Sequence, residues 1–407
     1  MGEMKAALPA RSFIRRWWPL ALPHLYYPVV IAVCVCAYVH LALSVCGTRA
    51  TAEINILFGA DASRVIDDMT CPEGNHFRTK MHPLFVLLTC PTGTALSGAI
   101  PNKALVGGMI VVAIGAATLV VFALTLHALG IPHARGVIYV ALLGSSGAFL
   151  TWSAIPETHM LGGLGVMLAC YLVASRRHPL LLVPAGLIAG GAALPNLAPW
   201  LTLAWLRTPS LRRVVALCAL TITTLTLLAL LQRHIYPSAT LWFMPDTYAK
   251  DYRYFVWQDE TVFWLARPFK VLSYFAVWPL ALPGIESKLH PLGPRMIFVL
   301  REQLSPTFLI GLAFWFIAFL GLRRTVCPHR SLVVALSIGL TPQYAFFLLY
   351  STETFLFAGA WIGQVALLLA LLLEASPSRL VSWALVSLIV AQFIVNWHGL
   401  QSALASL

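Results

Sequence analysis

Long runs of apolar residues dominate the chain. Residues 27–45, 105–128 and 214–231 carry almost only apolar side chains, and a bilayer core needs about 20 such residues for one helical crossing. Because lipid cannot satisfy backbone N–H and C=O groups, each run must close its own hydrogen bonds as a helix. Alternation of apolar and polar residues at period 2, which would indicate strands, is absent. The pattern predicts an all-α integral membrane protein.

Runs of this kind recur, and they predict a polytopic bundle of about eleven transmembrane helices. The predicted crossings are residues 27–45, 104–128, 136–153, 158–175, 180–194, 197–208, 213–232, 307–322, 331–350, 355–373 and 380–398. Pro195 and Asn196 interrupt the run between 180 and 208, so two alternatives stand there: two full spans, or a broken or re-entrant pair.

Two long segments are predicted to lie outside the bilayer, on the same side of it. Residues 46–103 form the first external loop, and residues 233–306 form a second large external or interfacial segment. Together they hold most of the ionisable groups, and the second mixes aromatic with charged residues as interfacial segments do. With no appended soluble domain visible, residues 1–407 are predicted to be a single transmembrane domain.

An amphipathic helix is predicted inside the first loop. Residues 60–69 place Asp61, Arg64 and Asp68 at helical spacing, with Val65 and Met69 behind them. A helix with one charged and one apolar face is suited to lie in the membrane interface.

Composition supports the membrane assignment, and the charge distribution indicates the orientation. Of 407 residues, 59% are hydrophobic and 10% are charged, too few charges for a soluble domain of this size. The net charge of +12 comes from basic residues in the N-terminal tail and alternate loops, which the positive-inside rule assigns to the cytoplasm together with the N-terminus. Nucleic acid is therefore not expected as a partner. All acidic residues except Glu3 and Glu374 then face the periplasm, lumen or cell exterior.

The cysteines and the absent motifs narrow the chemistry. No cysteine has metal-ligand spacing, while Cys46, Cys71 and Cys90 lie on the non-cytoplasmic side, where a disulfide is chemically allowed and the pairing is left open. The chain has no Walker-type loop, His-x-x-x-His pair, nucleophile elbow or Cys-x-x-Cys. ATPases, zinc proteases and hydrolases of those types are disfavoured.

The order of residues in the first loop is similar to that of a known family. Asp61 follows the first apolar run, the amphipathic helix comes next, and His82-Pro83-Leu84 precedes the following run. This order resembles the first external loop of GT-C glycosyltransferases, which take a sugar from a polyprenyl-phosphate carrier and include protein O-mannosyltransferases and aminoarabinose transferases. The family turn is His-Pro-Pro-Leu or related, so one proline is missing here, and Ala62 stands where the family often has Glu. The resemblance implies a GT-C-like fold and an inverting transferase.

The residue types in the loop suit this chemistry. Sugar transfer from a lipid phosphate to a hydroxyl needs a carboxylate to accept a proton, and cations to stabilise the departing phosphate. Asp61 is the predicted general base, and Arg78, Lys80 and His82 are predicted to bind the donor phosphate. The structural alternatives are that Asp61 stabilises the dipole of the helix it begins, and that Arg78 and Lys80 bind anionic lipid headgroups.

Four more residues are candidates for substrate binding. Asp67 and Asp68 follow the base on the same predicted helix, with pairing to Arg64 or Lys80 as the alternative. The GT-C resemblance implies that Glu157 and His159, in a loop between two crossings, lie beside the active-site cavity. Capping of the next helix explains Glu157 equally well.

Two further cations are candidates in the second external segment. Arg267 and Lys270 lie three residues apart in an apolar stretch and can present two positive charges on one helical face to the donor phosphate. The alternative is that both side chains reach to lipid headgroups.

The sequence therefore predicts a membrane glycosyltransferase of the GT-C type, working on the non-cytoplasmic side. Its expected partners are a polyprenyl-phosphate sugar donor, a glycan, lipid or small acceptor, and membrane lipids. No cofactor is required, since Arg and Lys can neutralise phosphate, while a divalent cation near Asp61 and Asp67 stays an open alternative. The alternative functions are a transporter or flippase of lipid-linked sugars, which should carry polar groups near the bilayer midplane, and a structural subunit.

Overall fold

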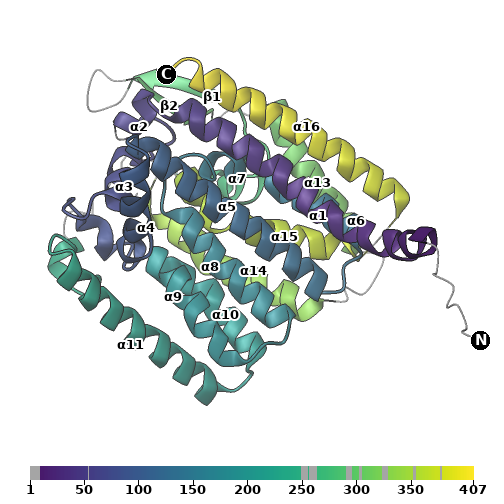
Figure 1. The fold of residues 1–407 in the computed structure, drawn as a ribbon, viewed down its shortest axis with the longest axis horizontal. Coiled ribbons are helices and arrows are strands. Elements are labelled where there is room, and N and C mark those ends of the chain that lie inside the picture. The colour runs from purple at the N-terminus through teal and green to yellow at the C-terminus, as the bar shows by residue number, and fades with distance from the viewer. Residues whose placement is uncertain are drawn as a thin grey trace, which may run out of the picture.

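The computed structural model describes residues 10–53, 55–248, 255, 264–289, 296–301, 305–322, 329–351, 354–375 and 378–407, and most of them are helical (Figure 1). The first half contains α1 (Ala10–Val45), α2 (Arg49–Ala52), α3 (Ala62–Thr70), η1 (Phe77–Lys80), α4 (Phe85–Ala99), α5 (Lys103–Ala128), α6 (His133–Gly144), α7 (Gly147–Trp152), α8 (His159–Ala174), η2 (Pro179–Leu181), α9 (Leu182–Ala192), η3 (Leu194–Asn196) and α10 (Leu197–Arg207). The second half contains α11 (Leu211–Ile235), η4 (Pro245–Tyr248), α12 (Arg267–Leu272), η7 (Ser273–Val277), β1 (Ile285–Leu289), β2 (Met296–Leu300), α13 (Pro306–Leu322), α14 (Arg330–Leu349), η8 (Thr354–Ala360), α15 (Ile362–Leu373) and α16 (Arg379–Leu404).

The prediction of an α-helical membrane protein is supported. Among the described residues, five helices are long and apolar enough to cross a bilayer, namely Tyr26–Val45 within α1, α5, α11, α14 and α16, and the bent pair η8 and α15 makes up to six. The other predicted crossings fall on shorter helices, such as α8 with 16 residues and α13 with 17. The number of eleven crossings is not confirmed.

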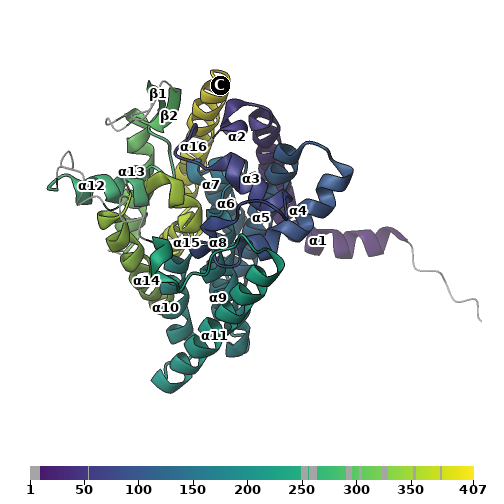
Figure 2. The ribbon, with the colours of Figure 1, turned by 90° about the vertical axis from the view of Figure 1, so that its left-hand side faces the viewer.

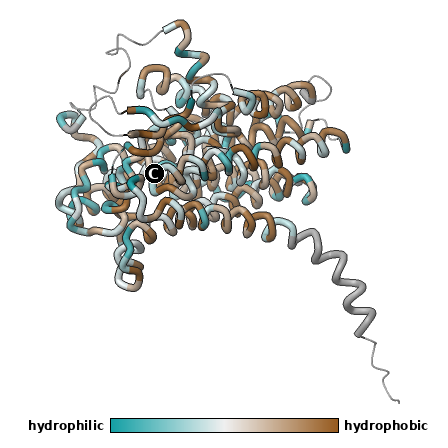
Figure 3. The backbone as a smooth tube through the Cα atoms, turned by 90° about the horizontal axis from the view of Figure 1, so that it is seen from above, coloured by the Kyte–Doolittle hydropathy of each residue, from teal (hydrophilic) through white to brown (hydrophobic). Residues whose placement is uncertain are grey.

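Polar residues gather at one end of the bundle. The first-loop helices α2, α3 and α4, the β1–β2 hairpin and the C-terminus lie at this end, whereas α1 begins at the other (Figure 1). Hydrophilic positions are concentrated there, beside the apolar helices (Figure 3). Figure 2, which looks toward this end, shows α2, α3 and α4 on one side and α12 and the hairpin on the other. The two predicted external segments therefore lie at the same end.

The predicted run between residues 180 and 208 is interrupted by a short turn at Pro195-Asn196, a feature common to both alternatives. α9 ends at Ala192, and α10 begins at Leu197 after a short 3₁₀ turn. Each has 11 residues, about 16 Å of helix against a hydrocarbon core of about 30 Å. The Asn196 amide nitrogen donates to Ala189 O, and its oxygen accepts from Gln343 Nε2 at 3.0 Å. A buried amide pair therefore joins the break to α14.

The structure differs from the sequence prediction in containing strands. β1 and β2 form a two-stranded antiparallel hairpin in which Ile285 faces Leu300. Phe298 of β2 also pairs with the first loop, since its N–H donates to Ile56 O and its carbonyl accepts from Phe58 N, each at 2.8 Å. Five-residue strands are too short for a clear period-2 signal, and this pairing across the sequence is what extends the backbone.

Two glycines of α4 provide a test of its packing. A Cβ at Gly93 would lie 2.0 Å from the carbonyl oxygen of Met69, whereas at Gly98 it would meet nothing within 4 Å. We expect Gly93→Ala to lower stability by about 1–3 kcal/mol through overpacking. Gly98→Ala should be neutral or stabilise by up to about 1 kcal/mol, because it reduces the entropy of the unfolded chain. Thermal denaturation in detergent distinguishes them, and equal shifts would contradict the α3–α4 contact.

Candidate active site

The amphipathic helix of the first loop is present, with Asp61 at its start. α3 spans Ala62–Thr70, and Val65 and Met69 are fully buried. Asp61 is the N-cap residue, but its carboxylate accepts no capping hydrogen bond. It lies instead 3.2 Å from Arg64 Nε and 3.6 Å from Arg78 Nη2, on the same oxygen. Asp61 is thus held between two guanidinium groups, with its side chain 20% exposed.

A chain of alternating charges extends inward from Asp61. Arg64 Nη1 donates to Asp68 Oδ2 at 2.8 Å, and the other Asp68 oxygen lies 2.8 Å from His76 Nδ1. Asp68 and His76 are both buried, whereas the neighbouring Asp67 is exposed. Of the two sequence alternatives for Asp68, pairing with Arg64 is the one observed. His76 was not singled out from the sequence, because a single His in a polar loop gives no sign of burial.

Arg78 and Lys80 lie on η1, beside the second external segment. Lys80 is buried, and its Nζ lies 5.5 Å from the centre of the Tyr248 ring, a cation–π arrangement. The Tyr248 hydroxyl is 2.8 Å from Lys80 O. Thr79 Oγ1 accepts from Thr240 N at 2.7 Å. The two external segments are thus joined at the point where both cations lie.

The His82-Pro83-Leu84 turn is fixed to two helices of the bundle. His82 Nδ1 lies 2.6 Å from Ala192 O, and Leu84 N donates to Gly191 O at 2.8 Å, so the turn contacts the end of α9. From α11, the buried Gln232 donates to Pro83 O and accepts from Leu87 N. Gln232 was not singled out from the sequence, because a glutamine within an apolar run shows no partner until the fold is known.

His82 and Glu157 both have perturbed acidity. Burial, and after it the neighbouring His159 and Arg64, hold the pKa of His82 well below its usual 6.5. The lowered pKa favours the neutral ring, and a neutral His82 that donates from Nδ1 to Ala192 O has Nε2 as an acceptor. In this form His82 can offer a hydrogen bond but no positive charge. Burial also raises the pKa of Glu157, against the opposing effect of Arg64.

The Glu157 loop meets the first loop. Glu157 Oε1 accepts from Thr158 N at 2.9 Å and lies 3.9 Å from His159 Nε2. The His159 ring is 5.8 Å from that of His82 and 4.6 Å from that of Phe357. Contacts thus form two sets, which interact electrostatically through Arg64 and which we together call the Asp61 cluster: Asp61, Arg64, Asp68, His76 and Arg78, and His82, Glu157 and His159.

The pH dependence of stability should report the neutral state of His82. The unfolded chain protonates this ring near pH 6.5 and the folded protein does not, so the unfolded state binds more protons below that pH. Stability should therefore fall as the pH is lowered through about 6.5, by at most about 1.4 kcal/mol per pH unit. His82→Asn, which keeps a donor for Ala192 O, should show a smaller fall between pH 7.5 and 5.5.

Thermal denaturation of the wild type and His82→Asn at each pH measures the difference in stability between the two proteins. In this difference the contributions of other titrating groups, such as Glu157, cancel. Identical pH dependence in the two proteins would contradict a neutral His82.

Arg267 and Lys270 occupy a different setting. The buried Arg267 donates to Phe347 O at 2.7 Å and Ser351 O at 2.5 Å, and so binds carbonyls at the end of α14. Helix ends leave such carbonyls without partners, so this contact has a structural purpose. Lys270 is half-buried on α12, where Leu265 and Phe269 are exposed, as an interfacial helix would leave them.

Among the described residues, neither a disulfide nor a group of metal ligands accompanies the Asp61 cluster. Cys46, Cys71 and Cys90 are all free thiols, and Cys90 Sγ lies 3.6 Å from Thr94 Oγ1. Among the described residues no group of three His, Cys, Asp or Glu side chains is placed to hold a metal ion.

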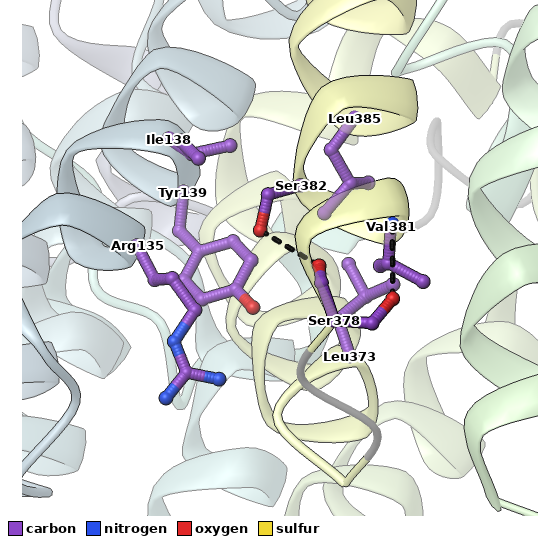
Figure 4. A pocket seen from close by; sticks show the side chains of 8 residues that line it. All are labelled: Arg135, Ile138, Tyr139, Leu373, Ser378, Val381, Ser382 and Leu385. Carbon is purple, nitrogen blue, oxygen red and sulfur yellow. Dashed lines mark hydrogen bonds between the residues drawn. The ribbon is translucent and has the colours of Figure 1, made fainter.

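A small pocket lies at the other end of the bundle, where α6 and α16 begin and α15 ends (Figure 4). Glu374 pairs there with Arg135 at 2.9 Å and accepts from the Tyr139 hydroxyl at 2.8 Å. The lining is otherwise Ile138, Leu373, Ser378, Val381, Ser382 and Leu385. Glu374 is one of the two acidic residues that the sequence analysis left on the predicted cytoplasmic side, together with the basic loops. Its contact with the loop residue Arg135 agrees with that expectation.

Comparison of the chain with protein-family profiles, with curated proteins and with solved structures gives no match. The Asp61 cluster and the membrane setting of the fold are the features of the molecule that bear on its function.

Proposed function

We propose that the chain is a GT-C-like membrane glycosyltransferase that moves a sugar from a polyprenyl-phosphate donor to an acceptor hydroxyl on the non-cytoplasmic side. The observation that carries the proposal is the setting of Asp61. Its carboxylate is not used as a helix cap, remains partly exposed, and lies between two arginines at the polar end of an apolar bundle. A carboxylate beside cations is what transfer from a lipid phosphate requires.

In the proposed reaction the acceptor hydroxyl oxygen attacks the anomeric carbon of the sugar. Its proton passes to Asp61, and the bond from the anomeric carbon to the phosphate oxygen breaks. The carrier phosphate leaves with the electron pair, and attack from the opposite face inverts the configuration at the anomeric carbon. No covalent enzyme intermediate is needed, because phosphate is already a good leaving group.

In this proposal the cations of the first loop have different roles in stabilising the phosphate. Arg78, 20% exposed and 3.6 Å from Asp61, can contact base and phosphate together, and a guanidinium suits bidentate phosphate binding. Lys80, whose Nζ lies against the Tyr248 ring, stabilises the phosphate by its positive charge. His82 and Glu157, which also belong to the Asp61 cluster, serve as hydrogen-bonding groups for donor or acceptor.

The proposal includes a topology. The N-terminus lies in the cytoplasm, the Asp61 cluster faces the periplasm, lumen or exterior, and the shorter helices complete about eleven crossings. The start of α1 and the end of α16 lie at opposite ends of the bundle, which supports an odd number of crossings (Figure 1).

The test is transfer of radiolabelled sugar from a panel of polyprenyl-phosphate donors, in membranes with and without the protein. Transfer that depends on the protein supports the proposal. If no donor gives transfer while the protein moves a lipid-linked sugar between leaflets, the proposed glycosyltransferase function is wrong. The protein would then be a flippase. A carrier should place polar groups near the bilayer midplane, whereas the Asp61 cluster lies at one end.

A further inference from the structure

Asp61 lies at the end of a tight turn whose backbone is unusual. The residues from Asn55 to Gly59 include three with positive φ: Asn55 at 58°, Phe58 at 55° and Gly59 at 74°. Residues other than glycine rarely adopt this conformation, and Asn is among the few that tolerate it. Such backbone persists where the surroundings fix it, which is common at functional sites.

The surroundings fix this turn from three directions. Asn55 N donates to Ala60 O at 2.9 Å and closes the loop. β2 holds its middle through the two hydrogen bonds of Phe298. The Phe58 ring packs against Trp152 and Phe355, with centroids 6.3 and 5.4 Å away. The turn is therefore a rigid support for the residue that follows it.

The Asn55 side chain connects this support to the carboxylate. With its amide nitrogen directed to Asp61, it donates to Asp61 Oδ1 at 3.2 Å and to Gly59 O at 3.0 Å. The opposite orientation would set the amide oxygen against these two acceptors, so the hydrogen-bond network assigns the nitrogen. Asp61 Oδ2 is bound by Arg64 and faces Arg78. Each carboxylate oxygen thus has a donor of its own.

We propose that Asn55 is a positioning residue for the base: its amide fixes the rotation of the Asp61 carboxylate, so that Oδ1 points its remaining lone pair toward the acceptor hydroxyl. This inference rests on the proposed glycosyl transfer. A carboxylate held only through Oδ2 could turn about its terminal bond, and a base gains rate only where its proton-accepting oxygen is already aligned.

Two substitutions separate positioning from loop closure. Asn55→Gly keeps the positive φ, which glycine adopts freely, and removes only the amide. Asn55→Asp keeps the shape and replaces the donor by a second carboxylate. With the radiolabelled donor that gives transfer, we expect kcat to fall about tenfold in Asn55→Gly, the effect of one lost hydrogen bond. The KM for the donor should stay within twofold.

The pH profile gives a readout that a purely structural role would not move. Losing the donor disfavours the ionised carboxylate, and a like charge disfavours it further. The acidic limb of kcat should therefore move to higher pH, more in Asn55→Asp than in Asn55→Gly. The other charged groups facing Asp61 are Arg64 from α3, Arg78 from η1 and Glu157 from the α7–α8 loop. The same shift in a Glu157→Gln background assigns the limb to Asp61.

A thermal double-mutant cycle of Asn55→Gly with Asp61→Ala tests the contact without an activity assay, because contacting residues give non-additive changes in Tm. Additive changes would overturn the contact itself. Transfer that depends on Asp61 but keeps its kcat and pH profile in both Asn55 variants would overturn the inference and leave the proposed function standing. Absence of transfer by the wild type would instead remove the proposed function, and positioning for catalysis with it.

Discussion

Asp61→Asn is expected to reduce sugar transfer by about 10²–10⁴-fold, the usual contribution of a general base. The amide has the size and shape of the carboxylate but cannot accept a proton at neutral pH. Arg64 and Arg78 keep an oxygen to contact, since both approach the same atom of Asp61. The loss should therefore appear in kcat, with donor binding within about twofold of wild type, as expected when an interaction made only in the transition state is removed.

Asp67→Asn is the matched control. Asp67 lies on the same helix and carries the same charge, but it is exposed on the opposite side from buried Val65 and Met69. Radiolabel transfer at equal expression should change less than about twofold, since exposed substitutions of this kind have small effects. Equal losses in the two variants would mean that the loop's total charge matters and that Asp61 is not the base.

Much of the architecture follows from the apolar pattern, because a membrane admits few alternatives. The helix of residues 60–69 was predicted from spacing alone and is present as α3. The interruption at Pro195 was expected, because proline removes a backbone donor. The strands were not expected, since β2 owes its conformation to pairing with Ile56 and Phe58, more than 200 residues earlier in the chain.

The candidate site was predicted only in part, and the reason is physical. Asp61, Arg78 and Glu157 belong to residue types that chemistry singles out, so a sequence shows them. Gln232 and His76 gain their roles from burial, which depends on which helices meet. Sequence also cannot give the charge of His82, because its depressed pKa arises from burial and from residues on other elements. Asn55 is noticeable only through its positive φ and its contact with Asp61.

Burial of the Asp68 ion pairs leads to the largest expected effect on stability. Asp68 has a side chain only 5% exposed, and it bridges Arg64 at 14% and His76 at 0%. Asp68→Ala removes the acceptor of the buried His76 Nδ1 and of Arg64 Nη1, and breaking one partner of a buried pair costs about 3–5 kcal/mol. For a chain of this length we expect a fall in Tm of roughly 5 °C in detergent.

The exposed pair between Arg49 and Glu53 is the control for this prediction. Its side chains are 48% and 32% exposed, and water screens such pairs, so Glu53→Ala should leave Tm unchanged within error. In a double-mutant cycle, Asp68→Ala with His76→Ala should cost less than the sum of the two single changes, because each single change removes the same contact. Additive costs would show that Asp68 and His76 do not interact. The buried carboxylate of Asp68 would then be stabilised by Arg64 alone.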